Sequence, residues 1–162
     1  IMQKLKLPFT EDDYNEARSY FERVERYSGF CAEMALCHAY DKKWEHGYDE
    51  ADIELYNAPI QVKSRLVNGT RKVFYSTHQA RGYNKVRGFI FGEVFYDLDE
   101  QSGYFEIYPY VFATEYVLGK SEDLKRGGNN YGPHIHEDHL DSCSSEFKHE
   151  IKEEHLIGLQ RA

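Results

Sequence analysis

The segment from Asp52 to Arg65 has two faces when it is read with the two-residue period of a β-strand. Its apolar face holds Ile53, Leu55, Ile60 and Val62, and its polar face holds Asp52, Glu54, Gln61, Lys63 and Arg65. Asn57-Ala-Pro59 supplies turn residues between the two halves. The segment therefore predicts a short antiparallel hairpin that gathers an acid, an amide and a lysine on one face.

The chain has 162 residues, of which 41% are hydrophobic, and this suits one domain with a buried core. We find no membrane-length apolar run and no charged-then-apolar leader, so we expect an intracellular, cytoplasmic protein with no membrane partner. The three cysteines are too few and too widely spaced for a disulfide framework. Cys31 and Cys37 fall in a helical pattern, which favours packed thiols.

The net charge of −8 argues against a nucleic-acid partner, but the charges are unevenly distributed. Residues 63–92 carry seven Lys and Arg and no acid, whereas residues 1–62 carry 7 against 13 acids and residues 93–162 carry 6 against 15. A solvated loop would have a similar composition. The interleaved Tyr75 and Tyr83 favour a surface that contacts phosphates.

Two helices are predicted before the hairpin. Thr10-Glu-Asp-Asp13 resembles a capping box and predicts a helix that continues to about Tyr27. Ser28-Gly29 interrupts the pattern, and a second helix is predicted from about Phe30 to Trp44. Glu33 lies beside the apolar stripe of this second helix.

The later segments favour more strands and a final helix. We expect strands at Lys72–Tyr75, Phe89–Leu98 and Tyr104–Phe112, a surface loop at Lys120–Pro133, and a helix over Ser145–Leu159. Groups of strands and helices in this order predict an α+β or mixed α/β architecture in a single domain of residues 1–162.

The polar face of the hairpin carries groups that suit metal-assisted hydrolysis of a phosphodiester. This reaction needs a divalent cation on the phosphate and a group that orients and deprotonates water. Asp52 would be the principal carboxylate and Gln61 would offer its amide oxygen, in keeping with the ligands that Mg²⁺ prefers. Lys63 would stabilise the developing charge. Glu33 and Glu54 are further carboxylates within reach.

These residues resemble the PD-(D/E)xK nuclease superfamily. Its pattern is an acid on a core helix, an Asp that opens a strand, and acid-x-Lys on the paired strand, which here fall on Glu33, Asp52 and Gln61-Val-Lys63. Asp49 is an alternative to Asp52, but only Asp52 has the strand parity of Glu54. The resemblance covers about residues 28–112, with residues 120–162 as an elaboration, and it implies a restriction-endonuclease-like core, which is a mixed sheet flanked by helices.

The resemblance implies a metal-dependent DNA endonuclease of the restriction, homing, repair or phage type, using Mg²⁺ or Mn²⁺. Asp52, Gln61, Glu33 and the main-chain carbonyl of Val62 would bind the metal, and Lys63 would activate water or steady the phosphate. Duplex DNA would be the substrate. A homodimer or higher homo-oligomer would match the two-fold symmetry of the duplex.

Gln61 departs from the family pattern, which usually has Glu or Asp at this position. A neutral amide offers an oxygen but removes one negative charge, so metal affinity falls unless Glu33 or Glu54 compensates. Two alternatives therefore stay open. One is a non-catalytic nucleic-acid-binding member of the same fold, and the other is an acidic protein-interaction domain, which the net charge of −9 over residues 93–162 suggests.

Several side chains of the basic block are expected to contact DNA: Arg65, Arg71, Lys72, Gln79, Arg81, Lys85 and Arg87. Gln79-Ala-Arg-Gly-Tyr83 is similar to the Gln-x-x-x-Tyr element of RecB-like nucleases, although a loop would contain these two residues by chance. His78 lies next to this element and is expected either to contact phosphate or to be structural.

The segment His134-Ile-His136-Glu-Asp-His139, with Cys143, has the residue types of a Zn²⁺ site. Its spacing does not match a standard zinc finger, and no CxxC accompanies it. We therefore expect an acidic, histidine-rich surface loop here rather than zinc.

Overall fold

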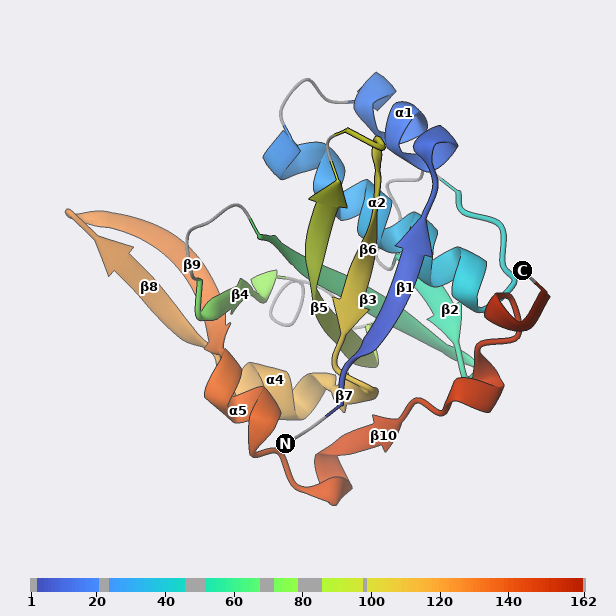
Figure 1. Cartoon of the computed structure of the whole chain (residues 1–162). Helices are drawn as coiled ribbons and strands as arrows, with labels where there is room; N and C mark the ends of the chain where they lie inside the picture. Colours follow the sequence, from blue (N-terminus) through green and yellow to red (C-terminus); the bar gives the residue numbers. More distant parts are fainter. Residues whose placement is uncertain are drawn as a thin grey trace.

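The computed structural model describes residues 3–20, 24–45, 52–67, 72–78, 86–97 and 99–161 of the chain. Helices and two β-sheets are combined in these residues, so the predicted mixed α+β class is confirmed (Figure 1). Each helix within the described ranges is too short or too polar to span a lipid bilayer.

The first two helices are α1 (Glu11–Tyr20) and α2 (Val24–Ala39). The predicted capping box is confirmed: the Asp13 amide donates to Thr10 Oγ1 over 3.2 Å, and the Thr10 amide donates to Asp13 Oδ2 over 2.9 Å. The predicted boundaries of the second helix are wrong. Ser28-Gly29 lies inside α2, and the helix ends before Asp41, whose φ of 55° is left-handed.

The larger sheet has seven strands in the described residues, with the order β1-β6-β5-β3-β2; in addition, β7 pairs with β5, and β10 pairs with β7. Its strands are β1 (Leu5–Phe9), β2 (Ile53–Leu55), β3 (Ala58–Leu66), β5 (Gly88–Asp97), β6 (Ser102–Ile107), β7 (Tyr110–Ala113) and β10 (Lys148–Glu150). β3 and β5 run parallel, and the other pairs are antiparallel. The strand predicted over Tyr104–Phe112 is thus two strands, β6 and β7, with Pro109 between them.

The predicted hairpin is present as β2 and β3, with Ile53 opposite Ile60. Its turn is at Tyr56-Asn57, where φ is 54° and 61°, and not at Asn57-Ala-Pro59. A two-residue hairpin turn of this kind needs positive φ at both central residues, and proline cannot adopt it. Pro59 therefore lies inside β3, and the two predicted faces of the hairpin are kept.

Apolar cores lie on both faces of the larger sheet. The first core joins α2 to alternate sheet residues: Leu7, Leu55, Ile60, Val62, Ile90, Val94, Phe105 and Ile107. The second core lies on the opposite face and includes Tyr75, Phe89, Phe91, Phe112, Ile135 and Leu140. This second face is covered in part by a smaller sheet of β4 (Phe74–Ser76), β9 (Asn129–His136) and β8 (Glu122–Arg126), with α4 (Thr114–Lys120) and α5 (Glu137–Asp141).

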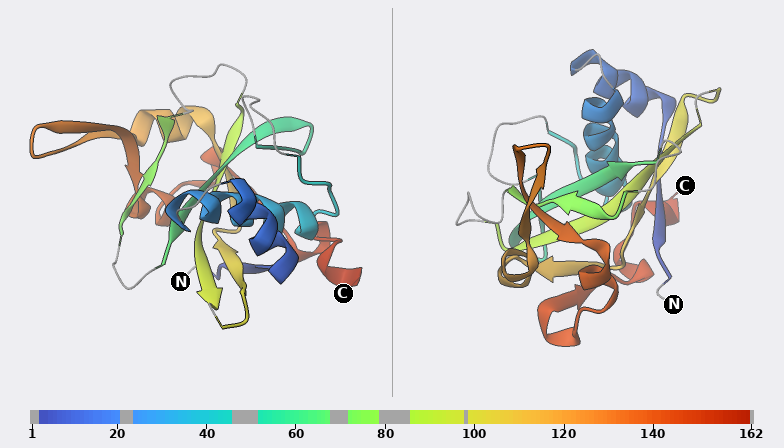
Figure 2. Two further views of the ribbon diagram at one scale, coloured as in Figure 1. Left: turned by 90° about the horizontal axis from the view of Figure 1, so that it is seen from above. Right: turned by 90° about the vertical axis from the view of Figure 1, so that its left-hand side faces the viewer.

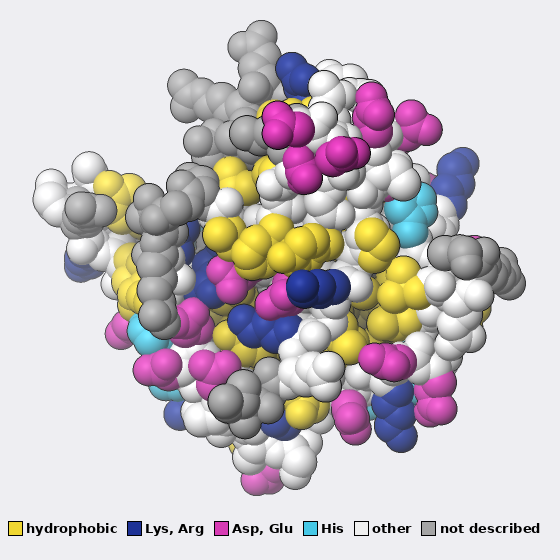
Figure 3. All heavy atoms as spheres, in the orientation of Figure 1, with side chains coloured by type: hydrophobic (Ala, Val, Ile, Leu, Met, Phe, Trp, Pro, Cys, Tyr) yellow, Lys and Arg dark blue, Asp and Glu magenta, His cyan; other side chains and the backbone are white. Residues whose placement is uncertain are grey.

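The outer part of the second face is less well covered. Phe95 and Tyr104 stack there with ring centroids 4.8 Å apart, and Lys6 lies over the Tyr104 ring at 4.8 Å. Figure 3 shows cationic and acidic side chains next to a band of hydrophobic side chains on this side of the molecule. Mixed charge of this kind gives the face no single electrostatic sign.

The surface loop predicted over Lys120–Pro133 is wrong, because β8 and most of β9 occupy these residues. The two strands form a hairpin that extends away from the rest of the molecule (Figures 1 and 2). The glycine pair that favoured a loop is its turn, with φ of 58° at Gly127 and 82° at Gly128. Exposed strands carry polar residues on both faces, so no two-residue alternation marks them in the sequence.

The helix predicted over Ser145–Leu159 is also wrong. The segment consists of short turns and a strand: η1 (Ser145–Phe147), β10, η2 (Glu153–His155) and η3 (Leu159–Arg161). β10 pairs with β7, and the Ile151 amide donates to the Pro109 carbonyl over 2.8 Å. Pairing with the sheet edge replaces the hydrogen bonds that a helix would have made.

Candidate active site

The centre of the candidate site is the edge of β3 at residues 61–63, called here the β3 edge. The strand pairing of β2 ends at Ile53, opposite Ile60, so β2 does not pair with these three residues. Asp52 directly precedes Ile53 and lies beside the β3 edge. Its amide donates to the Ile60 carbonyl over 3.1 Å, and its Oδ2 accepts from the Val62 amide over 2.9 Å. Because the N–H and C=O of a strand residue point toward the same side, the Val62 carbonyl also points to this edge.

Gln61 and Asp52 are in direct contact at the β3 edge. Gln61 Nε2 donates to Asp52 Oδ2 over 2.7 Å, and Gln61 is only 6% exposed. Burial raises the pKa of Asp52, while the hydrogen bond from the Val62 amide and the positive charge of Lys63 act in the opposite direction. Asp52 is therefore a partly dehydrated carboxylate whose position is fixed by two donors.

Glu33 reaches the same site from α2. Burial holds the pKa of Glu33 well above its usual range, and the negative charge of Asp52 raises it further. A hydrogen bond from Trp44 and the charge of Lys63 act against this rise in the pKa of Glu33. The mutual effects place both carboxyl groups and the lysine in one electrostatic unit.

Lys63 is the cation of this unit. Burial lowers the pKa of Lys63, and the nearby Asp52 and Glu33 partly restore it. The charges of Glu33, Asp52 and Lys63 thus act on one another, and their role as a site stays a prediction. The neighbouring Cys37 thiol is a poor nucleophile, since burial and the Glu33 charge raise its pKa to about 12.

Each of these three groups is shifted by burial toward its neutral form, an arrangement that is enriched at functional sites. A bound divalent cation would reverse the shift of the carboxyl groups by favouring their charged forms. Within the ranges that the structure describes, no three His, Cys, Asp or Glu side chains converge on one point. The oxygen donors at the β3 edge are instead two carboxylates, an amide and a main-chain carbonyl, a hard-donor set that fits Mg²⁺.

The orientation of the Gln61 side chain makes the site fit Mg²⁺ less well. Its amide nitrogen faces Asp52, so its oxygen points elsewhere. The amide must turn over before Gln61 Oε1 and Asp52 can share a cation. Glu54, the other carboxylate expected within reach, is exposed on β2 opposite Pro59.

Arg65 lies on the same strand face as Lys63, but it is buried in a separate ion-pair cluster. Its Nη2 donates to Glu137 Oε2 over 2.9 Å and lies 3.5 Å from Glu93 Oε1. Its guanidinium stacks over the Tyr75 ring at 4.1 Å. The sequence did not indicate either acidic partner. Glu93 and Glu137 follow Arg65 by 28 and 72 positions, and no local pattern marks them as its neighbours.

The remaining residues expected to contact DNA are only partly covered by the structure. Lys72 and Arg87 are exposed. Arg71, Gln79, Arg81, Tyr83 and Lys85 lie outside the described residues, as does Asp49. Contact of this block with DNA stays a prediction.

The histidine-rich segment is a strand and a short helix, not the loop that was expected. His134 and His136 lie on β9, and His139 lies on α5. The imidazole of His134 donates from Nδ1 to the Gly132 carbonyl over 2.9 Å, and His136 Nδ1 accepts from the Asp138 amide over 3.0 Å. One ring nitrogen of His134 and one of His136 therefore form hydrogen bonds within the fold.

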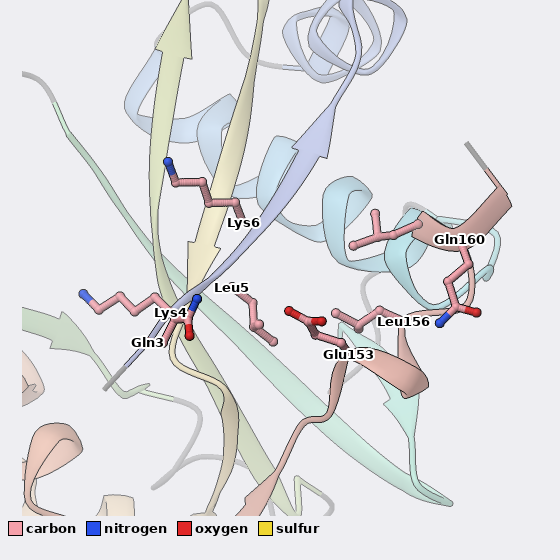
Figure 4. A pocket seen from close by; sticks show the side chains of 8 residues that line it. Gln3, Lys4, Leu5, Lys6, Glu153, Leu156 and Gln160 are labelled. Carbon is pink, nitrogen blue, oxygen red and sulfur yellow. The ribbon is translucent and has the colours of Figure 1, made fainter. Parts of the chain in front are cut away.

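A groove with a volume of about 440 Å³ lies between β1 and the C-terminal segment (Figure 4). Its lining residues are Gln3, Lys4, Leu5, Lys6, Glu153, Leu156, Leu159 and Gln160. The predicted site residues do not line it. The groove and the β3 edge are thus separate features.

Comparison with known proteins gives no relative from which a role could be transferred: no protein-family model matches the chain, and no curated protein matches it significantly.

Proposed function

We propose that this protein is a metal-dependent DNA endonuclease of the PD-(D/E)xK type. The observation that carries the proposal is the meeting of Glu33, Asp52 and Lys63 at the β3 edge, each with its pKa displaced by burial. The order of the elements supports it. A core helix supplies the first acid, Asp52 directly before β2 is the second, and β3 supplies Gln61 and Lys63 between β2 and its parallel partner β5.

Glu33, Asp52, Gln61 and the Val62 carbonyl would hold Mg²⁺ or Mn²⁺. When bound, the cation supplies Lewis-acid polarisation of the phosphate and lowers the pKa of water. Asp52 is held in place for this role by the Val62 amide. Lys63 carries a proton that burial makes easier to release, and it stabilises negative charge that develops on a phosphate oxygen beside it.

Duplex DNA is the proposed substrate, and a homodimer would place one site against each strand. An intracellular, reducing setting belongs to the same proposal, since Cys31, Cys37 and Cys143 are all free thiols.

One observation favours a second candidate, a DNA-binding member of the fold that does not cut. The bonds from Gln61 Nε2 and the Val62 amide satisfy Asp52 Oδ2 without a cation. Metal binding must then replace the Gln61 bond.

Nicking of supercoiled plasmid separates the candidates. We expect the wild type to nick with Mg²⁺ and not with EDTA, and Lys63→Ala to be about 100-fold slower or worse, since proton transfer by a placed group contributes about 10²–10⁴-fold. Lys43→Ala is the matched control, because Lys43 is exposed and outside the site. A wild type that binds DNA but never nicks it supports the second candidate. A wild type that binds no DNA at low salt supports the acidic protein-interaction domain.

A further inference from the structure

The hairpin of β8 and β9 is anchored at its base and extended at its tip. β4 pairs with β9 at residues 134–136, and the Thr77 amide donates to the Pro133 carbonyl over 2.9 Å. His78 packs at the base, where a side chain on Gly132 would collide with its ring. Beyond this point the described pairings join the two strands to each other, from Leu124 opposite Gly132 to the turn.

We call residues 124–132 the ribbon. Most of it is exposed on both faces: Lys125, Gly127, Gly128, Asn129, Asn130 and Tyr131. A two-stranded hairpin that buries so little apolar surface is marginally stable and adds little to the folding of the domain. An exposed, anchored hairpin of this kind is suited to interaction with a partner.

A bulge in the ribbon presents an aromatic ring. Lys125 is opposite Asn130 while Leu124 is opposite Gly132, so Tyr131 is the extra residue. Gly132 has a φ of 79°, and its amide donates to Asn130 Oδ1 over 2.9 Å, which fixes the bulge. Tyr131 is 51% exposed, more than any other large hydrophobic side chain in the described residues.

The chemistry of the ribbon suits nucleic acid. The ribbon, residues 124–132, contains Lys125 and Arg126 and no acid, while Glu122 and Asp123 lie at the base of the hairpin, opposite His134 and Pro133. Lysine and arginine bind guanine O6 and N7, asparagine binds adenine N6 and N7, and aromatic rings contact sugars or bases. Amide and cationic groups side by side are thus the donors that base edges require.

We propose that this ribbon enters the major groove of duplex DNA tip first and reads base edges there through Lys125 on one face, Asn129 on the other face and Tyr131 at the bulge. The groove is about 12 Å wide and about 8.5 Å deep, and it admits a two-stranded ribbon. The three ribbon residues of β8, 124–126, extend about 10 Å at about 3.3 Å per residue, which is comparable with the depth of the groove. The inference deepens the proposed function and rests on it for the choice of duplex DNA as substrate.

A contact between two copies of the chain is the competing use of such a ribbon. The cores of homodimer interfaces are apolar and depleted of charge. The ribbon offers a half-buried Leu124 and one tyrosine among glycines, amides and cations. Its composition therefore favours DNA.

The test is binding with Ca²⁺ in place of Mg²⁺, so that affinity is measured apart from cleavage. A preferred duplex is selected by the wild type from a library of 30-base-pair duplexes with a randomised centre. Fluorescence anisotropy then compares this duplex with a scrambled one. We expect Lys125→Ala and Asn129→Ala each to reduce the preference about tenfold or more, with partial rescue by Lys125→Arg. Lys120→Ala, an exposed lysine on α4, should leave the preference unchanged.

Four outcomes overturn the inference. Three come from the binding assay: a wild type without sequence preference, ribbon variants that keep the wild-type preference, and variants that weaken both duplexes equally. Loss of a dimer in light scattering by the ribbon variants would overturn it in favour of a subunit contact. Failure of the wild type to nick any plasmid in Mg²⁺ counts instead against the proposed function, because the binding assay involves no cleavage.

Discussion

Gln61 donates its amide hydrogen to Asp52 Oδ2 over 2.7 Å, and the same oxygen accepts the Val62 amide over 2.9 Å. Gln61 therefore holds the carboxylate that would bind the metal, while its own oxygen is turned away. An acid at position 61 could not make this bond when both groups are charged. If the proposed function holds, the glutamine stabilises the metal-free site at the expense of metal affinity.

Gln61→Glu should increase metal affinity and decrease stability without metal. The added carboxylate raises the ligand charge, so the Mg²⁺ concentration for half-maximal nicking should fall about tenfold. In EDTA at pH 8 the free energy of unfolding should fall by about 1–3 kcal/mol, because a buried donor is replaced by a like charge. Metal titration of nicking and urea denaturation measure the two effects. Gln160→Glu, at an exposed position, should show neither, and an unchanged metal requirement in Gln61→Glu would refute the role of this residue.

Glu33→Gln should make stability less dependent on pH. The folded-state pKa of Glu33 lies above its unfolded value of about 4.5, so the folded protein holds a proton that the unfolded chain releases. In EDTA the contribution of Glu33 to the free energy of unfolding is fully present below about pH 4.5, and it is lost as the pH rises through the pKa of Glu33 in the folded protein. The variant should match the wild type near pH 4 and exceed it at pH 8, by about 1.4 kcal/mol for each unit of the pKa rise.

Urea denaturation of both proteins from pH 4 to pH 8 gives this difference. A Glu33→Gln variant that becomes less stable relative to the wild type as the pH rises would contradict the buried position of Glu33.

Arg65→Met should destabilise the fold strongly. The change leaves Glu137 without its 2.9 Å partner and removes the guanidinium from the Tyr75 ring. Loss of one partner of a buried ion pair costs about 3–5 kcal/mol, because the other charge stays buried. Chemical denaturation measures this, with the exposed Arg87→Met as control. A loss below about 1 kcal/mol would mean that the buried cluster contributes little.

Thr10→Ala should cost about 1 kcal/mol, since it leaves the Asp13 amide without its capping oxygen. Thermal unfolding provides the measurement. Ser19→Ala, in the last turn of the same helix, should change the melting temperature less, because its hydroxyl makes only an exposed bond to Glu16. Equal effects of the two changes would argue against the capping role.

The features that the sequence predicted well depend on neighbours close in the chain. The capping box spans Thr10 to Asp13, and the two faces of the hairpin follow from a period of two residues. The meeting of Asp52, Gln61 and Lys63 follows from the same period once the turn is short. Whether the groups catalyse the proposed reaction stays a prediction.

The features that it missed depend on distant parts of the chain. Phe147 and Ile151 are four residues apart, as on one face of a helix, yet Phe147 is 41% exposed while Ile151 is buried. The pairing of β10 with β7 determines the conformation of this segment, and no local sequence pattern indicates that pairing. The partners of Arg65 were missed for the same reason.

The parallel pair β3 and β5 sets the order in which the site can be made during synthesis. Ile60 pairs with Gly88 and Leu66 with Val94, so every partner is translated 28 residues later. At about 5–20 residues per second, a growing chain carries all the charged groups of the site for roughly 1–6 s before the strand that supports them exists. A stable sheet requires this long-range pairing. The growing chain should therefore become able to carry out the proposed reaction only after β5 has been made, although the last reactive residue of the site has emerged before then.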